Sequence, residues 1–200
     1  VEGSPNALAW DGSSLWVTSY FSKTVQQIDL DKGVVTATIS VGEFPSALAW
    51  DGSSLWVTND VSGTVQQIDP DSGDELATIE VRDTPNALAW DGNSLWVANS
   101  GGDTVQKIDP KQGKVVSTIS VGRNPRRLAW DGNSLWVANI SDSTVMRIDP
   151  AGMGAVIATI TVGDYPDALA WDGASLWVAN RDSNTVQQID PAGTGEVVAT

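Results

Sequence analysis

The sequence predicts an all-β protein, a five-bladed β-propeller of four-stranded antiparallel blades with about 40 residues in each blade. The first observation is a repeat that covers the chain, because the segment ALAWDGSSLWV at Ala7 returns in copies that start at Ala47, Ala87, Arg127 and Ala168. The second is that each copy holds four short runs rich in Val, Thr, Ile and Trp, separated by turn residues. The third is that no segment carries the apolar stripe of an amphipathic helix.

In the first unit we expect strands at Asn6–Asp11, Leu15–Ser19, Thr24–Asp29 and Val34–Val41. The first ends in an Asp-Gly pair typical of hairpin turns, where Asp tolerates a left-handed backbone. The second contains the consecutive apolar residues Leu-Trp-Val, which indicates that neighbouring blades cover both faces of the sheet. The third ends in an Asp whose carboxylate can accept N–H groups of the next turn, and the fourth is rich in Val and Thr.

The chain is expected to form one domain, residues 1–200. Its repeat units are approximately 5–44, 45–84, 85–124, 125–165, and 166–200 together with 1–4. The last unit uses both chain ends because Val1–Pro5 matches Val41–Pro45, while the C-terminal residues match the start of a fourth strand. We therefore predict a monomeric ring that closes noncovalently where the N-terminal residues meet the C-terminal strand.

The Trp residues occur at the same two positions in every repeat unit. Each unit contributes two of the ten Trp residues, and burial of one such side chain stabilises a fold by about 3 kcal/mol. We interpret them as core residues between blades rather than as a ligand cage, since a cage would not need five identical copies. The pairs are Trp10/Trp16, Trp50/Trp56, Trp90/Trp96, Trp130/Trp136 and Trp171/Trp177.

Composition excludes several classes of function. The net charge is −14 and the pI is near 4.1, which disfavours a nucleic-acid partner because phosphate binding depends on Lys and Arg. The chain has no Cys and no His, so it offers no disulfide, no thiolate ligand and no imidazole base. No apolar run approaches the ~20 residues of a membrane-spanning helix. We expect no cofactor, no metal site and no membrane partner.

The unit LWVAN…TVQQIDP…GEVVATI…LAWDG resembles the YVTN-type β-propeller repeat and is similar to the NHL and streptogramin-lyase-like propellers. Leu95–Asn99 stands where that family has its name motif, with Trp in place of the initial Tyr. The resemblance spans nearly the whole chain, implies the propeller architecture and favours an extracellular or periplasmic location. Lyases of this group use a catalytic His near a divalent metal. Because this chain has no His, the resemblance does not transfer that activity.

Differences between the five copies point to a binding face. In an antiparallel meander the turns after the first and third strands share one face of the disc, and those turns recur in every copy. The loops after the second and fourth strands share the opposite face, here called the variable face, and carry nearly all the divergence. Loops held by a rigid scaffold often bind partners, and aromatic and Arg side chains dominate binding hot spots. The candidate binding residues are Tyr20, Phe21, Phe44, Arg82, Arg123, Arg126, Arg127, Tyr165 and Arg181.

The acidic residues have a mainly structural interpretation. Ten Asp residues occupy the two repeated turns, and the spacing of a calcium loop is absent. A glycosidase needs two carboxyl groups about 5–9 Å apart, and no pair stands out among the variable-face carboxylates. These carboxylates are Glu43, Asp60, Asp83, Asp142, Asp164, Asp167 and Asp182.

Three functions remain open from the sequence. The preferred one is a noncatalytic binding or scaffold module whose variable face binds a protein or a carbohydrate. The second is a carboxylate-based enzyme of the lyase or glycosidase type. The third is an engineered or recently amplified repeat protein without a specific ligand, in which the variable loops reflect drift after duplication.

Overall fold

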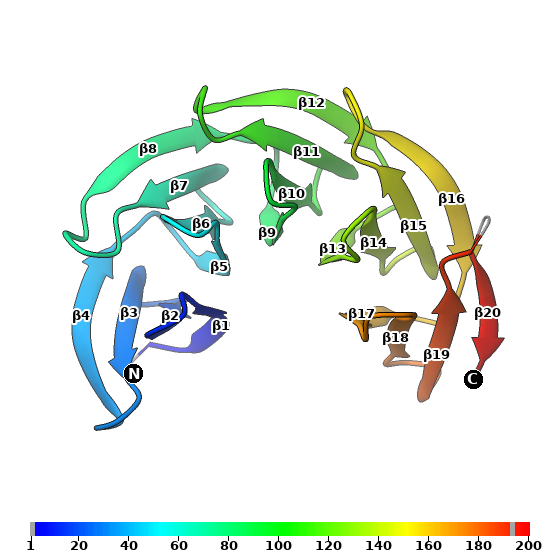
Figure 1. Cartoon of the computed structure of the whole chain (residues 1–200), viewed down its shortest axis with the longest axis horizontal. Helices are drawn as coiled ribbons and strands as arrows, with labels where there is room; N and C mark the ends of the chain where they lie inside the picture. The colour runs from blue at the N-terminus through cyan, green and yellow to red at the C-terminus, as the bar shows by residue number, and fades with distance from the viewer. Residues whose placement is uncertain (1–2, 193–194) are drawn as a thin grey trace.

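The computed structural model describes residues 3–192 and 195–200, and these form twenty strands in five four-stranded antiparallel sheets. Each sheet is one copy of the repeat, with its strands in sequence order (Figure 1). The predicted all-β architecture of five blades is therefore confirmed. We number the blades 1 to 5 in chain order.

The strand bounds are nearly identical from copy to copy. Blade 1 contains β1 (Pro5–Trp10), β2 (Leu15–Ser19), β3 (Thr24–Asp29) and β4 (Val34–Ser40). Blade 2 contains β5 (Pro45–Trp50), β6 (Leu55–Asn59), β7 (Thr64–Ile68) and β8 (Glu75–Glu80). Blade 3 contains β9 (Pro85–Trp90), β10 (Leu95–Asn99), β11 (Thr104–Asp109) and β12 (Lys114–Ser120). Blade 4 contains β13 (Pro125–Trp130), β14 (Leu135–Asn139), β15 (Thr144–Asp149) and β16 (Ala155–Thr161). Blade 5 contains β17 (Pro166–Trp171), β18 (Leu176–Asn180), β19 (Thr185–Asp190) and β20 (Glu196–Ala199).

The core lies between blades. At the first interface, Trp16 and Val25 of blade 1 pack against Leu48, Leu55 and Ile68 of blade 2. Equivalent residues form the other three interfaces. A four-stranded sheet has apolar side chains on both faces here, so packing against neighbouring blades buries them and stabilises the sheet.

Only part of the predicted Trp core is fully buried. The second Trp of each pair is inaccessible in blades 1 to 4, whereas Trp177 of blade 5 is partly exposed. The first Trp of each pair lies nearer the sheet edge and is partly exposed, up to 50% for Trp10. The second Trp residues are therefore the main spacers between blades.

The blades form an open arc rather than a closed ring. Inner strands pack in the series β1, β5, β9, β13 and β17, but no strands of blades 5 and 1 are among the closely packed pairs in the described part of the chain. Figure 1 shows the two chain ends on opposite sides of a gap between these blades. The predicted closure is thus not found, because the interface side chains set the rotation from blade to blade and these rotations do not complete a circle. Val1 and Glu2, which that prediction also used, lie outside the described residues.

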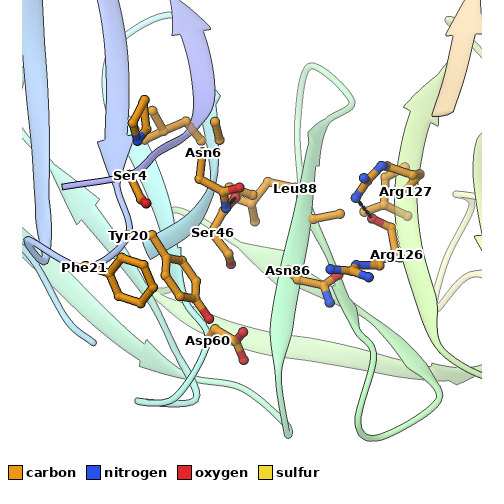
Figure 2. A pocket seen from close by; sticks show the side chains of 16 residues that line it. Ser4, Asn6, Tyr20, Phe21, Ser46, Asp60, Asn86, Leu88, Arg126 and Arg127 are labelled. Carbon is orange, nitrogen blue, oxygen red and sulfur yellow. Dashed lines mark hydrogen bonds between the residues drawn. The ribbon is translucent and has the colours of Figure 1, made fainter. Parts of the chain in front are cut away.

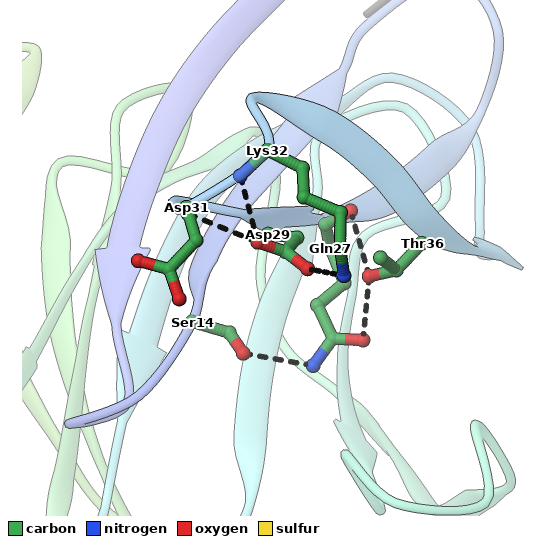
Figure 3. A network of polar contacts seen from close by, with 6 residues as sticks. All are labelled: Ser14, Gln27, Asp29, Asp31, Lys32 and Thr36. Atoms are coloured by element: carbon green, nitrogen blue, oxygen red, sulfur yellow. Dashed lines mark hydrogen bonds and ion pairs between the residues drawn. The ribbon is translucent and has the colours of Figure 1, made fainter.

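Carboxylates organise the repeated turns. Asp29 accepts hydrogen bonds from the backbone N–H groups of Asp31 (2.9 Å) and Lys32 (3.0 Å), and from Lys32 Nζ (2.8 Å) (Figure 3). The role expected for the Asp that ends each third strand is confirmed. The explanation expected for the Asp-Gly turns is wrong, because only Gly12 of that pair has positive φ (101°) in blade 1. Asp11 instead accepts the N–H groups of Ser13 and Ser14.

No peptide bond between described residues is cis, so the loop prolines are trans there. The described residues also contain no helix with the length and apolar character needed to cross a bilayer.

Candidate functional site

Each inner strand contains a β-bulge just after its first proline. In blade 2, Pro45 pairs with Asn59 and Ala47 pairs with Thr58, which leaves Ser46 as the extra residue. A bulge bends the strand and redirects the extra side chain. The same register shift occurs near the start of every inner strand. The residues after the prolines are Asn6, Ser46, Asn86, Arg126 and Asp167.

Four of these residues line one pocket of about 730 Å³ on the inner side of the arc. Asn6, Ser46, Asn86 and Arg126 come from blades 1 to 4, so the pocket is assembled by four consecutive repeats. Figure 2 shows Asn86 between Arg126 and the side chains of the first two blades. The pocket is bounded at the variable face by Tyr20, Phe21 and Asp60.

The bulges are linked between blades by hydrogen bonds. Asn6 Nδ2 donates to the carbonyl of Ser46 (3.0 Å), and Ser46 Oγ donates to the carbonyl of Pro85 (2.9 Å). Asn86 Nδ2 donates to Ser100 Oγ (2.7 Å) within blade 3. The polar side chains of the pocket wall are therefore held by hydrogen bonds to backbone carbonyls of the next blade and, for Asn86, to Ser100.

Three of the four predicted aromatic residues form a cluster at the pocket rim. The Tyr20 ring lies 4.7 Å from the Phe44 ring and 5.3 Å from the Phe21 ring, between centroids. Phe21 is 67% exposed. The chain places these rings together because the backbone N–H of Tyr20 donates to Ser4, and that of Asp60 donates to Phe44. These bonds join the loops of the variable face, as the meander predicts.

Asp60 is the charged group beside this cluster. Burial raises its pKa above the usual value, although its hydrogen bond with Tyr20 and the nearby Arg126 act in the opposite direction. Burial also raises the pKa of Tyr20, and the Asp60 charge adds to that rise. Tyr20, Asp60 and Arg126 thus interact electrostatically across the pocket (Figure 2).

Tyr165 lies with the arginines rather than with the other aromatic residues. Arg126 donates to Tyr165 Oη (3.3 Å), and the Arg181 guanidinium lies 3.5 Å from the Tyr165 ring centroid. Tyr165 does not join the cluster of Tyr20, Phe21 and Phe44, because it directly precedes blade 5 and the gap separates blade 5 from blade 1. The four aromatic candidates therefore form two groups, and Arg126 lies between them.

The sequence-based prediction assigned Arg126 and Arg127 to a loop of the variable face. Both residues instead belong to strand β13. Arg126 is the bulge residue that faces the pocket. Arg127 donates through Nε to the carbonyl of Asp167 (2.6 Å) and through Nη2 to its carboxylate (2.6 Å). Arg127 therefore joins blade 4 to blade 5 at the pocket edge.

The remaining two predicted residues are outside the pocket lining. Arg123 is exposed and pairs with Asp142 at 2.6 Å within the variable-face loops. Arg82 is exposed, and its backbone N–H donates to Gln106 Oε1 (3.0 Å). Neither residue is brought to the same place as Tyr20 or Arg126.

Asn6, Ser46 and Asn86 are not among the site residues that the sequence predicts, and Asp60 is predicted only as one of several carboxylates of the variable face. A usable signal was present, because the residue after the loop proline is variable inside an otherwise repeated inner strand, reading Asn, Ser, Asn, Arg and Asp. Such a variable position within a constant strand indicates a side chain that the fold does not require.

The variable-face carboxylates do not form a pair at the pocket. Asp60 is the carboxylate in the lining, while Asp142, Asp167 and Asp182 form ion pairs with arginines. Among the described residues no group of three or more Asp or Glu side chains is arranged to hold a metal ion. The chemistry that this site offers is hydrogen bonding, one acid–base group and aromatic contact.

No protein-family model matches the chain. No curated protein matches it in sequence either. Solved structures do match in fold, with more than a thousand similar chains.

Three structural neighbours define the fold. A putative 6-phosphogluconolactonase from Bacteroides uniformis has a TM-score of 0.80 and 17% identity, with 96% of this chain and 68% of that chain covered. A functionally unknown protein from Desulfotomaculum acetoxidans has a TM-score of 0.84 and 17% identity, covering 100% and 70%. Streptogramin B lyase has a TM-score of 0.82 and 15% identity, covering 99% and 69%. At these identities the likeness is one of fold, and it shows that this chain has the propeller-like arrangement of these proteins.

Proposed function

We propose that this chain is a noncatalytic binding module whose pocket and aromatic rim hold part of a partner at the variable face. One observation carries the proposal: four bulges direct polar side chains of three types, Asn, Ser and Arg, into one pocket beside an exposed aromatic cluster. The fold needs only the repeated residues, so the divergence at these positions is free to serve recognition. We also propose that the chain is a divergent member of the YVTN/NHL-type repeat group.

The chemistry of the pocket favours a carbohydrate. Asn6, Ser46 and Asn86 supply amide and hydroxyl groups, and amides both donate and accept hydrogen bonds. Arg126 adds donors and Asp60 adds acceptors, which together suit the many hydroxyl groups of a sugar. The exposed ring of Phe21 provides an apolar surface against which the C–H face of a sugar can pack.

A protein partner is the second candidate within the same function. Arg and aromatic side chains are the residue types that contribute most to protein interfaces. Phe21 and Arg126 supply both types on opposite sides of the pocket, and Tyr165 lies beside Arg126. A protein loop that inserts a polar side chain into the pocket would use the same residues.

The enzyme alternative is favoured by one observation, the raised pKa of Asp60 in a pocket. A carboxyl group with such a pKa can act as a general acid. The pocket lining contains no second carboxylate to serve as base or nucleophile among the described residues, so a two-carboxylate glycosidase mechanism is not supported there.

The test is a glycan array followed by calorimetric titration with the best-bound sugar. We expect the double variant Phe21→Ala with Phe44→Ala, and separately Asn86→Ala, to weaken binding at least ~10-fold, which corresponds to about 1.4 kcal/mol. Leu30→Ala is the matched control, because Leu30 is 56% exposed in a repeated turn of the opposite face. Equal binding by all three variants would place the ligand elsewhere.

The other functions predict different results. Capture of one defined protein, lost in the double variant and kept in Leu30→Ala, would favour the protein partner. Turnover of the bound sugar, lost in Asp60→Asn while binding persists, would favour the enzyme. Absence of any ligand in either screen would support a repeat protein whose only selected property is folding.

A further inference from the structure

The interface between two blades is made by two different faces. The forward face of a blade contains residues equivalent to Trp16 and Val25, and it packs on the backward face of the next blade, which contains residues equivalent to Leu48, Leu55 and Ile68. Four copies of this interface occur in the arc. The arc therefore ends with one forward face on blade 5 and one backward face on blade 1.

The forward face of blade 5 is uncovered. Val186 occupies the place of Val145 one blade earlier, yet Val186 is 54% exposed and Val145 is fully buried. Trp177 is partly exposed, whereas its equivalent Trp136 is inaccessible. Ala170 is exposed as well. These residues are apolar because the repeat makes them interface residues.

The backward face of blade 1 is uncovered in the same way. Leu8 is 62% exposed, while its equivalent Leu48 is 9% exposed. Trp10 is half exposed. Pro5 is exposed, although the four equivalent prolines are buried. The two ends thus carry complementary halves of one interface that the protein already forms four times.

The lengths of the structural neighbours indicate how many further blades would fill the gap between these two faces. This chain covers 68–70% of three similar propeller proteins while 96–100% of it is matched. The uncovered share, about 30% of a longer chain, corresponds to about two units of 40 residues. Figure 1 places the gap between β17–β20 and β1–β4.

We propose that the two end faces are docking surfaces for a pair of four-stranded blades of this same repeat type. The first docked blade presents a backward face to Val186 and Trp177, and the second presents a forward face to Leu8 and Trp10. The occupant is specified by continuity with the existing interfaces, since Leu-, Val-, Ile- and Trp-bearing sheets already cover these residue types at every internal position. The proposal does not depend on the ligand of the pocket.

A second copy of the chain fits less well. Blade 1 of one copy could dock on blade 5 of another, but such a head-to-tail contact leaves two further end faces open. It would extend the assembly instead of filling the gap. Two blades use both faces and leave no open end.

The test appends residues 79–161, which contain two complete blades of this chain, directly after Thr200. Ile79 follows Thr78, the counterpart of Thr200 in the repeat, so the outer strand continues in register. The native chain contains no Cys, so a single introduced thiol reports burial by its rate of labelling. We compare Val186→Cys and Leu8→Cys in the 200-residue and extended chains.

We expect both thiols to react rapidly in the 200-residue chain and at least ~10-fold more slowly in the extended chain, because a buried thiol reacts only after local opening. Val61→Cys is the control, since Val61 is 59% exposed in a variable-face loop of blade 2 and should react equally in both. Val145→Cys should stay slow in both chains and reports that the fold is intact. A second extension with residues 39–120 repeats the test with other blades.

Equal labelling of Val186→Cys in the two chains would overturn the proposal, as would protection of only one end face. Protection in the 200-residue chain that increases with protein concentration would identify a second copy as the occupant and would also overturn it. Rapid labelling of Val145→Cys in both extended chains would show that added blades disrupt the fold, so that this repeat cannot accept its own blades at its ends, and would also overturn the proposal.

Discussion

The indole nitrogen of Trp56 donates a 2.7 Å hydrogen bond to Oδ2 of Asp51, which ties a turn of the sheet edge to the core between blades. The other carboxylate oxygen accepts the backbone N–H groups of Ser53 (2.8 Å) and Ser54 (2.7 Å). The equivalent indole–carboxylate bond occurs in all five blades, at 2.6–2.7 Å. The repeated Asp and the repeated Trp are therefore one structural unit.

Replacement of Asp51 by Asn should lower the free energy of unfolding by about 1–3 kcal/mol, because a buried donor loses a charged acceptor. Urea unfolding followed by Trp fluorescence measures the change. Asp31→Asn is the control, since Asp31 is exposed in a turn, and it should change stability little. An equal loss in both variants would contradict the assigned role.

The lowered pKa of Asp51 predicts that the stability change in Asp51→Asn depends on pH. Burial raises the pKa of Asp51, but hydrogen bonds from Trp56, Ser54 and Ser53 outweigh burial, so the pKa lies below its usual value of 3.8. A lowered pKa stabilises the folded state above the unfolded value and loses that contribution as pH falls through the folded pKa. The deficit of Asp51→Asn should therefore be largest near neutral pH and shrink below about pH 3.8. A deficit that stays constant to pH 2.5 would contradict this.

Replacement of Asp60 by Asn should change stability with pH in the opposite direction. Burial raises the pKa of Asp60 despite its bond with Tyr20 and the nearby Arg126. A raised pKa makes the folded state relatively more stable below the unfolded value, and that advantage is lost as pH rises through the folded pKa. We expect Asp60→Asn to be more stable than the parent at pH 7, by less than about 1 kcal/mol because Asp60 is partly solvated. The gain should vanish below about pH 3.8.

The matched control for Asp60 is Asp142→Asn. The backbone N–H and guanidinium of Arg123 lower the pKa of Asp142, so this variant should lose stability at neutral pH instead of gaining it. Unfolding curves at pH 3 and pH 7 for both variants decide the matter. The same sign of change in both would contradict the burial of Asp60.

Most of the fold was predictable because the repeat states the same local information five times. Strand ends at Leu15, Ser19, Thr24 and Asp29 agree with the sequence-based ranges, since apolar runs and turn residues determine them. Closure was not predictable. It depends on the small rotation between blades, which side-chain packing sets and which no local pattern encodes.

The site was predictable only in part, for a physical reason. Exposed aromatic residues and arginines are recognisable by type, and Tyr20, Phe21, Phe44 and Arg126 do lie at or beside the pocket. The side chain of Asn86 depends on strand register, because one residue of slip reverses the face on which a side chain lies. The bulge supplies that slip, and its position is known only when both strands are paired.

Replacement of Thr84 by Asn should stabilise the protein. Thr84 has φ of 59°, a left-handed conformation that is unfavourable for a β-branched residue. The equivalent position in blade 4 is Asn124, with φ of 57°, and Asn tolerates this region better. We expect Thr84→Asn to raise the free energy of unfolding by about 0.5–1 kcal/mol. Thr78→Asn, in strand β8 of blade 2, is the control and should destabilise, because Asn is disfavoured in strands.

The last prediction compares one substitution at two equivalent positions. Val145→Ala removes two methyl groups from a fully buried interface and should lower the free energy of unfolding by about 1–3 kcal/mol. Val186→Ala makes the same chemical change where the side chain is 54% exposed, so the loss should be less than about 0.5 kcal/mol. Both variants have the same strand position and the same backbone propensity change, so their difference isolates burial. Urea unfolding at pH 7 measures both. Equal losses would mean that another blade already covers the end face of blade 5 in solution, since only a covered Val186 has contacts to lose.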